Sequence, residues 1–168
     1  MSTRMNFSGI QKGLVLFWAV WLSLVSLTNV CDALKSLDVL PENWTLASYN
    51  FDLVRSAVGT HGVPVTVAAV LFAGVIAWEI LASALLWRAF AAMLRGQPGT
   101  SPAVTQAFFV SLALWAAFLI ATEATVDYLT AGTHKATLIA QLVTLIVVRA
   151  GAESLMAEPA AKVDRSLG

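Results

Sequence analysis

The side chain best placed to do chemistry in this sequence is a single carboxylate, Glu79, in the middle of an apolar stretch from Val63 to Arg88. That stretch is long enough to cross a bilayer as a helix, which needs about 20 apolar residues. An ionisable group at that depth costs about 3 kcal/mol or more, so it usually faces protein or water and has a partner. Glu79 is therefore the first candidate for a functional residue.

Helix geometry predicts Arg149 as the partner of Glu79. At about 1.5 Å per residue, Glu79 lies about 23 Å below Val63, and Arg149 lies about the same distance below His134. Equal depths predict a buried ion pair. Such a pair would either fix the register of two helices or leave Glu79 to handle a proton or a ligand. Glu153, one turn beyond Arg149, competes for the same guanidinium.

A second group of titratable residues is expected at the outer surface, namely His61, His134, Glu123 and Asp127. Two histidines with carboxylates at one depth could hold a divalent metal such as Zn or Cu. No H-x-x-x-H or E-x-x-H spacing supports this: His61 and His134 precede different spans, and Glu123 and Asp127 lie four residues apart at the end of the third span. The preferred interpretation is that they cap helices and contact lipid headgroups, and no resident metal is predicted.

Four tryptophans are expected near the middle of the membrane. Trp21, Trp78 and Trp115 fall about 16–18 Å from the inner boundary, and Trp18 lies one turn from Trp21. Aromatic belts belong at the interfaces, so these rings either pack within a bundle or form a surface for another protein's helices or for a bound lipid, quinone or carotenoid. No other cofactor is predicted. The indole N–H groups need acceptors at that depth, and Glu79 could supply one.

The composition excludes several classes of protein. Of the 168 residues, 58% are hydrophobic and 12% are charged, whereas a soluble domain carries about 25% charged residues. The zero net charge gives no field to attract nucleic acid, and the single cysteine, Cys31, excludes an internal disulfide and a cysteine-based metal cluster. Nucleophile motifs, phosphate loops and mid-membrane histidines are absent, so an enzyme acting alone is not expected.

The apolar segments predict an all-α polytopic membrane protein, a bundle of four transmembrane helices in one membrane domain. The spans are expected at residues 10–31, 63–90, 103–127 and 135–156, with an outer loop at 32–62 and a cytoplasmic tail at 157–168. Asn50 is expected to cap a short interfacial helix in the loop. Thr130 to His134 are expected to form a turn, and the tail is expected to be disordered.

Basic residues near the N-terminus, between the second and third spans, and in the tail predict which way the chain is inserted. The positive-inside rule then places both termini in the cytoplasm, and we expect a bacterial inner membrane. Two stripes of small residues would let helices approach closely, either within the chain or against a partner. They are Ala69, Ala73 and Ala77, and Ala113, Ala117 and Ala121.

A set of residues in these segments also carries a resemblance. They are Asn29, Asp32, Asn50-Phe51, Val54, Trp78-Glu79, Ala82, Leu85-Leu86, Arg88-Ala89, Leu114-Trp115 and Phe118. With them the chain resembles the family of predicted small bacterial four-span integral membrane proteins of unknown function, over roughly residues 10 to 150. The usual histidine of the outer-loop motif and the glycine-rich end of the third span are not obvious here. The family has no catalytic assignment, so the resemblance implies a fold and no mechanism.

Two functions remain open, with a third behind them. The first is a non-catalytic accessory or scaffolding subunit of a larger membrane complex, such as a redox or photosynthetic assembly, in contact with lipids and other membrane subunits. The alternative is a small transporter, or a protein that binds an ion or an apolar ligand, using Glu79. The third is a metal-dependent subunit using His61 and His134.

Overall fold

The structure is a computed structural model that describes residues 7–164, with the side chains of residues 8–128 and 130–152. Within this range the chain forms helices α1 (Phe7–Ser36), α2 (Asn50–Gly59), α3 (Val65–Leu94), α4 (Pro102–Ala124) and α5 (Tyr128–Asp164), and no strand. All except α2 are long and apolar enough to cross a membrane. The predicted all-α bundle of four spans is therefore confirmed.

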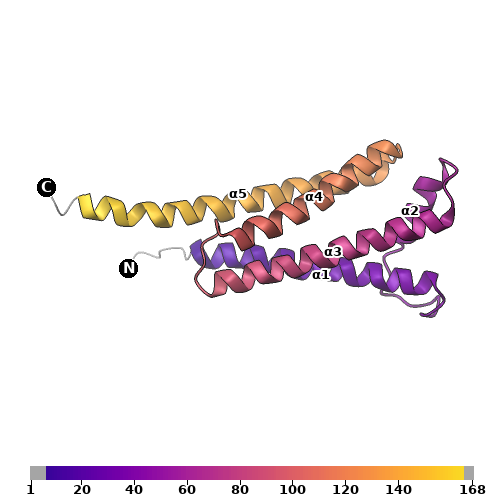
Figure 1. The fold of residues 1–168 in the computed structure, drawn as a ribbon, viewed down its shortest axis with the longest axis horizontal. Coiled ribbons are helices and arrows are strands. Elements are labelled where there is room, and N and C mark those ends of the chain that lie inside the picture. The colour runs from indigo at the N-terminus through magenta and orange to yellow at the C-terminus, as the bar shows by residue number, and fades with distance from the viewer. Residues whose placement is uncertain (1–6, 165–168) are drawn as a thin grey trace.

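The four long helices run up and down between two ends of the bundle (Figure 1). α1 packs on α3, α3 on α4, and α4 on α5, so each contact but the first joins neighbours in sequence. The helical segments next to the N-terminus and the C-terminus lie at one end, and α2 lies at the other end, beside α3. We call the end of the bundle that carries α2 the α2 end.

Proline and glycine set several helix boundaries. Pro64 precedes α3, and Pro102 is the first residue of α4, where its missing N–H costs no helical hydrogen bond. α3 ends just before Gly96, whose φ of +86° is a conformation that glycine adopts readily. In the same turn, a Cβ on Gly99 would overlap the carbonyl oxygen of Val148, so the turn packs directly on the backbone of α5.

Polar contacts tie the helices together near the end that carries the termini. Gln11 Nε2 donates to the Val148 carbonyl oxygen at 2.6 Å, and Trp18 Nε1 donates to Thr144 Oγ1 at 3.0 Å. Gln141 is fully buried and exchanges hydrogen bonds with Ser111 at 2.8 and 2.9 Å. Polar groups in an apolar medium need such partners, so these contacts fix the register of α5 against α1 and α4.

Three boundaries differ from the prediction. Asn50 is the first residue of α2 rather than its cap, since Tyr49 precedes it in a left-handed conformation with φ 62°. The predicted turn at Thr130 to His134 is wrong: α5 begins at Tyr128, because Asp127 accepts hydrogen bonds from the backbone N–H and hydroxyl of Thr130. The predicted disordered tail is helical as far as Asp164, and residues 165–168 lie outside the described part of the chain.

The alanine stripe on the second span does not form a contact within the chain, which was one of the two uses expected of it. Ala69, Ala73 and Ala77 are all exposed, and so is Ala121 at the α2 end of α4. The buried small residues of α3 fall on another face, which includes Ala82, Ser83 and Ala89. Spacing four residues apart identifies a helical stripe but does not say which way it faces.

Candidate functional site

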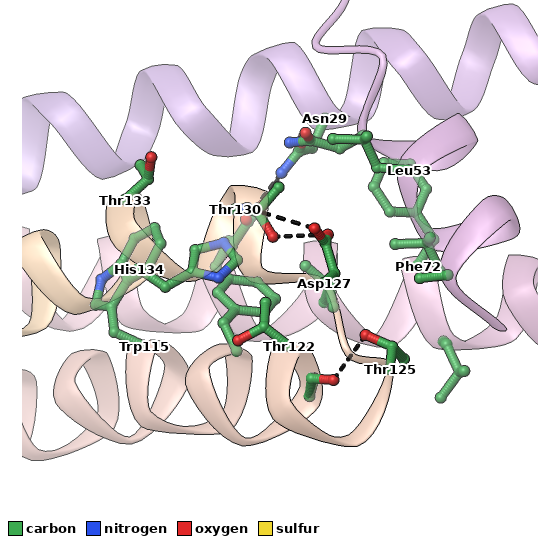
Figure 2. Close-up of a pocket in the computed structure, with 18 of the residues that line it drawn as sticks. Asn29, Leu53, Phe72, Trp115, Thr122, Thr125, Asp127, Thr130, Thr133 and His134 are labelled. Carbon is green, nitrogen blue, oxygen red and sulfur yellow. Dashed lines mark hydrogen bonds between the residues drawn. The ribbon is translucent and has the colours of Figure 1, made fainter.

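A cavity of about 470 Å³ lies in the half of the bundle toward the α2 end, and all five helices contribute to its lining. Figure 2 shows Asn29 from α1, Phe72 from α3, Thr122 from α4 and His134 from α5 around this space. Leu53, from α2, also lines it. Much of the wall is aliphatic and aromatic, so the space is suited to a molecule with an apolar body.

Glu79, from the middle of α3, is part of the cavity lining and is 1% exposed. Asn29 Nδ2, on α1, donates to both of its carboxylate oxygens at 2.8 Å. Among the described residues, no lysine or arginine forms an ion pair with Glu79. The carboxylate is therefore oriented by a neutral amide, which satisfies its hydrogen bonding and leaves any negative charge unbalanced.

The same asparagine connects Glu79 to α2. Asn50 Nδ2, at the start of α2, donates to Asn29 Oδ1 at 2.8 Å. One turn further along α1, Asp32 Oδ2 accepts from the backbone N–H of Phe51 at 2.8 Å, so a side chain of α1 caps the first turn of α2. These bonds hold α2 over the cavity.

Aromatic rings form the wall nearer the middle of the bundle. The Trp21 and Trp115 ring centroids are 5.5 Å apart, and Trp18 lies 5.4 Å from Trp21. The His134 ring stacks on Phe118 at 5.1 Å. The Trp115 indole nitrogen and His134 Nδ1 are buried without a hydrogen-bond partner in the part of the chain that the structure describes.

Three of the four predicted tryptophans thus come together, and Trp78 does not. Trp78 is 36% exposed, and its indole nitrogen donates to the Val110 carbonyl oxygen at 3.1 Å. It stands next to Glu79 in sequence, but successive residues on a helix point about 100° apart. Trp78 therefore belongs to the contact between α3 and α4 rather than to the cavity.

The predicted ion pair between Glu79 and Arg149 is wrong. Arg149 is exposed, and its neighbour Val148 is level with Gln11, whereas Glu79 is level with Asn29. The two α1 positions are 18 residues apart, which is about 27 Å along the helix. The depth estimate began the last span at His134, whereas α5 begins six residues earlier, and this accounts for about 9 Å of the separation. The side chain of Glu153, the competing partner, is outside the described residues.

The metal candidates are not assembled into a site. Asp127 and His134 both line the cavity, whereas His61 and Glu123 are exposed. Within the described ranges, no group of three or more His, Cys, Asp and Glu side chains is placed to hold a metal ion. His134 is instead an aromatic member of the wall.

Sequence reasoning identified Glu79, Trp21 and Trp115 but gave no site role to Asn29 or Asn50. The available signal was an amide within the first span, where a polar side chain needs a partner. Comparisons with protein-family models, with curated proteins and with solved structures find no match to this chain. The resemblance to small four-span bacterial membrane proteins therefore stays a prediction.

Proposed function

We propose that this multi-pass membrane protein binds a small, mainly apolar molecule in the cavity beneath α2. The observation that carries the proposal is the cavity itself, a space of about 470 Å³ with aromatic walls and one buried carboxylate. Its size lies within the roughly 300–1,000 Å³ that ligand pockets occupy. This is the ligand-binding alternative raised by the sequence, and binding is also the first step that a transporter would need.

The distribution of basic residues supports a placement in a bacterial inner membrane with both termini in the cytoplasm. The cavity would then lie in the outer half of the bilayer, under a helix at the outer surface. α2 suits that position, because Leu53, Val54 and Ala57 line the cavity while Asp52 and Arg55 form an exposed ion pair at 3.0 Å. A ligand would enter from the outer side or from the outer leaflet.

Filling the cavity tests the proposal. Ala121→Trp adds a large ring at a lining position, and Ala124→Trp, three residues along the same helix, adds the same ring outside the lining. A photoactivatable alkylphenol in lipid nanodiscs should label peptides containing Trp21 and Trp115 in the wild type and in Ala124→Trp, with labelling lost in Ala121→Trp. Equal labelling of both variants would show that the cavity is not the binding site.

The accessory-subunit function remains a second proposal, favoured by a separate surface. A groove on the outside of the bundle, between α1 and α3, holds three hydrogen-bonded polar groups, with Ser23 Oγ bonded to Ser83 Oγ at 2.7 Å and to Trp87 Nε1 at 3.0 Å. Small hydroxyl residues let another helix approach closely. Extraction in mild detergent, followed by sizing and mass spectrometry, should then recover stoichiometric partner subunits, and Ser83→Leu should release them. A chain that runs alone would exclude this function.

A further inference from the structure

The charged side chains that line the cavity indicate which class of ligand it could bind. Among the described residues that line it, Glu79 and Asp127 are acidic, His134 is the remaining titratable side chain, and none is lysine or arginine. A carboxylate in a low-dielectric medium is strongly stabilised by a nearby positive charge. Among the described residues, no lysine or arginine pairs with Glu79, and its hydrogen-bond partner, Asn29, is neutral.

The walls favour one kind of cation. Trp21, Phe72, Trp115 and Phe118 all line the cavity, and the faces of aromatic rings attract cations. A small inorganic cation prefers several oxygen ligands, and no cluster of acidic or histidine side chains that could hold a metal ion is found among the described residues. An organic cation with an apolar body satisfies both the acid and the rings.

We propose that the ligand is a lipophilic organic cation whose charge is balanced by Glu79 and whose body packs against the aromatic wall. This rests on the proposed function, since it names the ligand class of the same cavity. Quaternary ammonium and phosphonium ions, with charge spread beneath an aryl or alkyl surface, have this chemistry. Asn29 orients the carboxylate by hydrogen bonds and, being uncharged, does not neutralise it.

The cation and a proton would compete for the same carboxylate, that of Glu79. Where Glu79 is protonated in the empty protein, binding of the cation releases one proton: the carboxyl O–H bond breaks, the proton leaves to solvent, and the carboxylate takes the cation. Where Glu79 is already ionised, the cation binds without proton release. Over the pH range in which Glu79 is protonated in the empty protein, the affinity for the cation should fall about tenfold for each unit by which the pH is lowered. Asp127 and His134 are the other titratable groups of the lining, and α1 and α2 contribute none to it.

The test compares a charged probe with a neutral one of similar shape, tetraphenylphosphonium and triphenylphosphine oxide, by calorimetry in nanodiscs. Wild type should bind the cation saturably. In the acidic range where its affinity depends on pH, it should also release one proton, measured in buffers of different ionisation enthalpy. Glu79→Gln, which keeps the shape of the side chain, should weaken the cation at least tenfold. Glu123→Gln, which removes an exposed carboxylate outside the lining, should leave binding unchanged.

Glu79→Asp keeps the charge and should bind the cation better than Glu79→Gln. If Glu79→Gln does not fold, proton release and pH dependence in the wild type decide the matter. Equal cation binding by wild type and Glu79→Gln, or equal affinity of wild type for both probes, would overturn the cation proposal. The proposed function would survive either result if Ala121→Trp still blocked the neutral probe, and it would fail if Ala121→Trp blocked neither probe.

Discussion

Replacing Asn29 with alanine should cost about 2 kcal/mol of stability, because this one side chain connects three helices. Its amide nitrogen lies 2.8 Å from both oxygens of Glu79, and its carbonyl oxygen accepts from Asn50 at 2.8 Å. A hydrogen bond to a charged group contributes about 1.5–3 kcal/mol and a neutral one about 1 kcal/mol. Measured interhelical hydrogen bonds in membranes average about 0.6 kcal/mol, which lowers the sum.

The free energy of unfolding can be measured by titrating the folded protein in mild detergent with dodecyl sulfate and following helix content. The matched control is Asn43→Ala, which changes an exposed asparagine in the loop between α1 and α2, where we expect no measurable change. A double-mutant cycle with Glu79→Ala should give a coupling energy of about 1 kcal/mol between Asn29 and Glu79. Equal effects of Asn29→Ala and Asn43→Ala, or a coupling of zero, would refute the contact as a source of stability.

Three further predictions use the same titration. Gly99→Ala should cost about 1–3 kcal/mol, since the added methyl overlaps the backbone of Val148; an unchanged midpoint would contradict the close packing of that turn. Gln141→Leu should cost about 1–2 kcal/mol by leaving the buried Ser111 hydroxyl without its side-chain partner, and a gain in stability would show that the pair is dispensable. Cys31, only 7% exposed, should resist a water-soluble maleimide in the folded protein and react as the bundle unfolds, whereas rapid reaction in mild detergent would mean that this part of α1 is open.

The four spans could be predicted because bilayer thickness sets a length and an apolar content that few soluble helices share. Helix ends could not be predicted as well, since they depend on individual hydrogen bonds. The bond from Thr130 to Asp127 starts α5 before the residues that had been expected to form a turn. A shift of six residues at a helix start is about 9 Å along its axis, which is part of the separation between Arg149 and Glu79.

Glu79 itself could be predicted as a site residue, because an ionisable group within an apolar span needs a reason to be there. The environment of Glu79 could not be predicted, because the sequence is compatible with several different partners for one carboxylate. Likewise, Trp21 and Trp115 could be placed at one depth, but only packing shows that their rings meet at 5.5 Å while Trp78 points elsewhere. Depth along a helix is readable from sequence, whereas direction around it requires the neighbouring helices.

A neutral partner for Glu79 has a different consequence from a charged one. An arginine at position 29 would hold the carboxylate in a permanent ion pair, and a cation entering the cavity would have to break that pair at the cost of a buried, unpaired charge. Asn29 instead fixes the carboxylate by hydrogen bonds and leaves its charge available to a proton or a ligand. The bond from Asn50 to Asn29 extends this connection to α2. A ligand that moved Glu79 would therefore also act on the helix that covers the cavity.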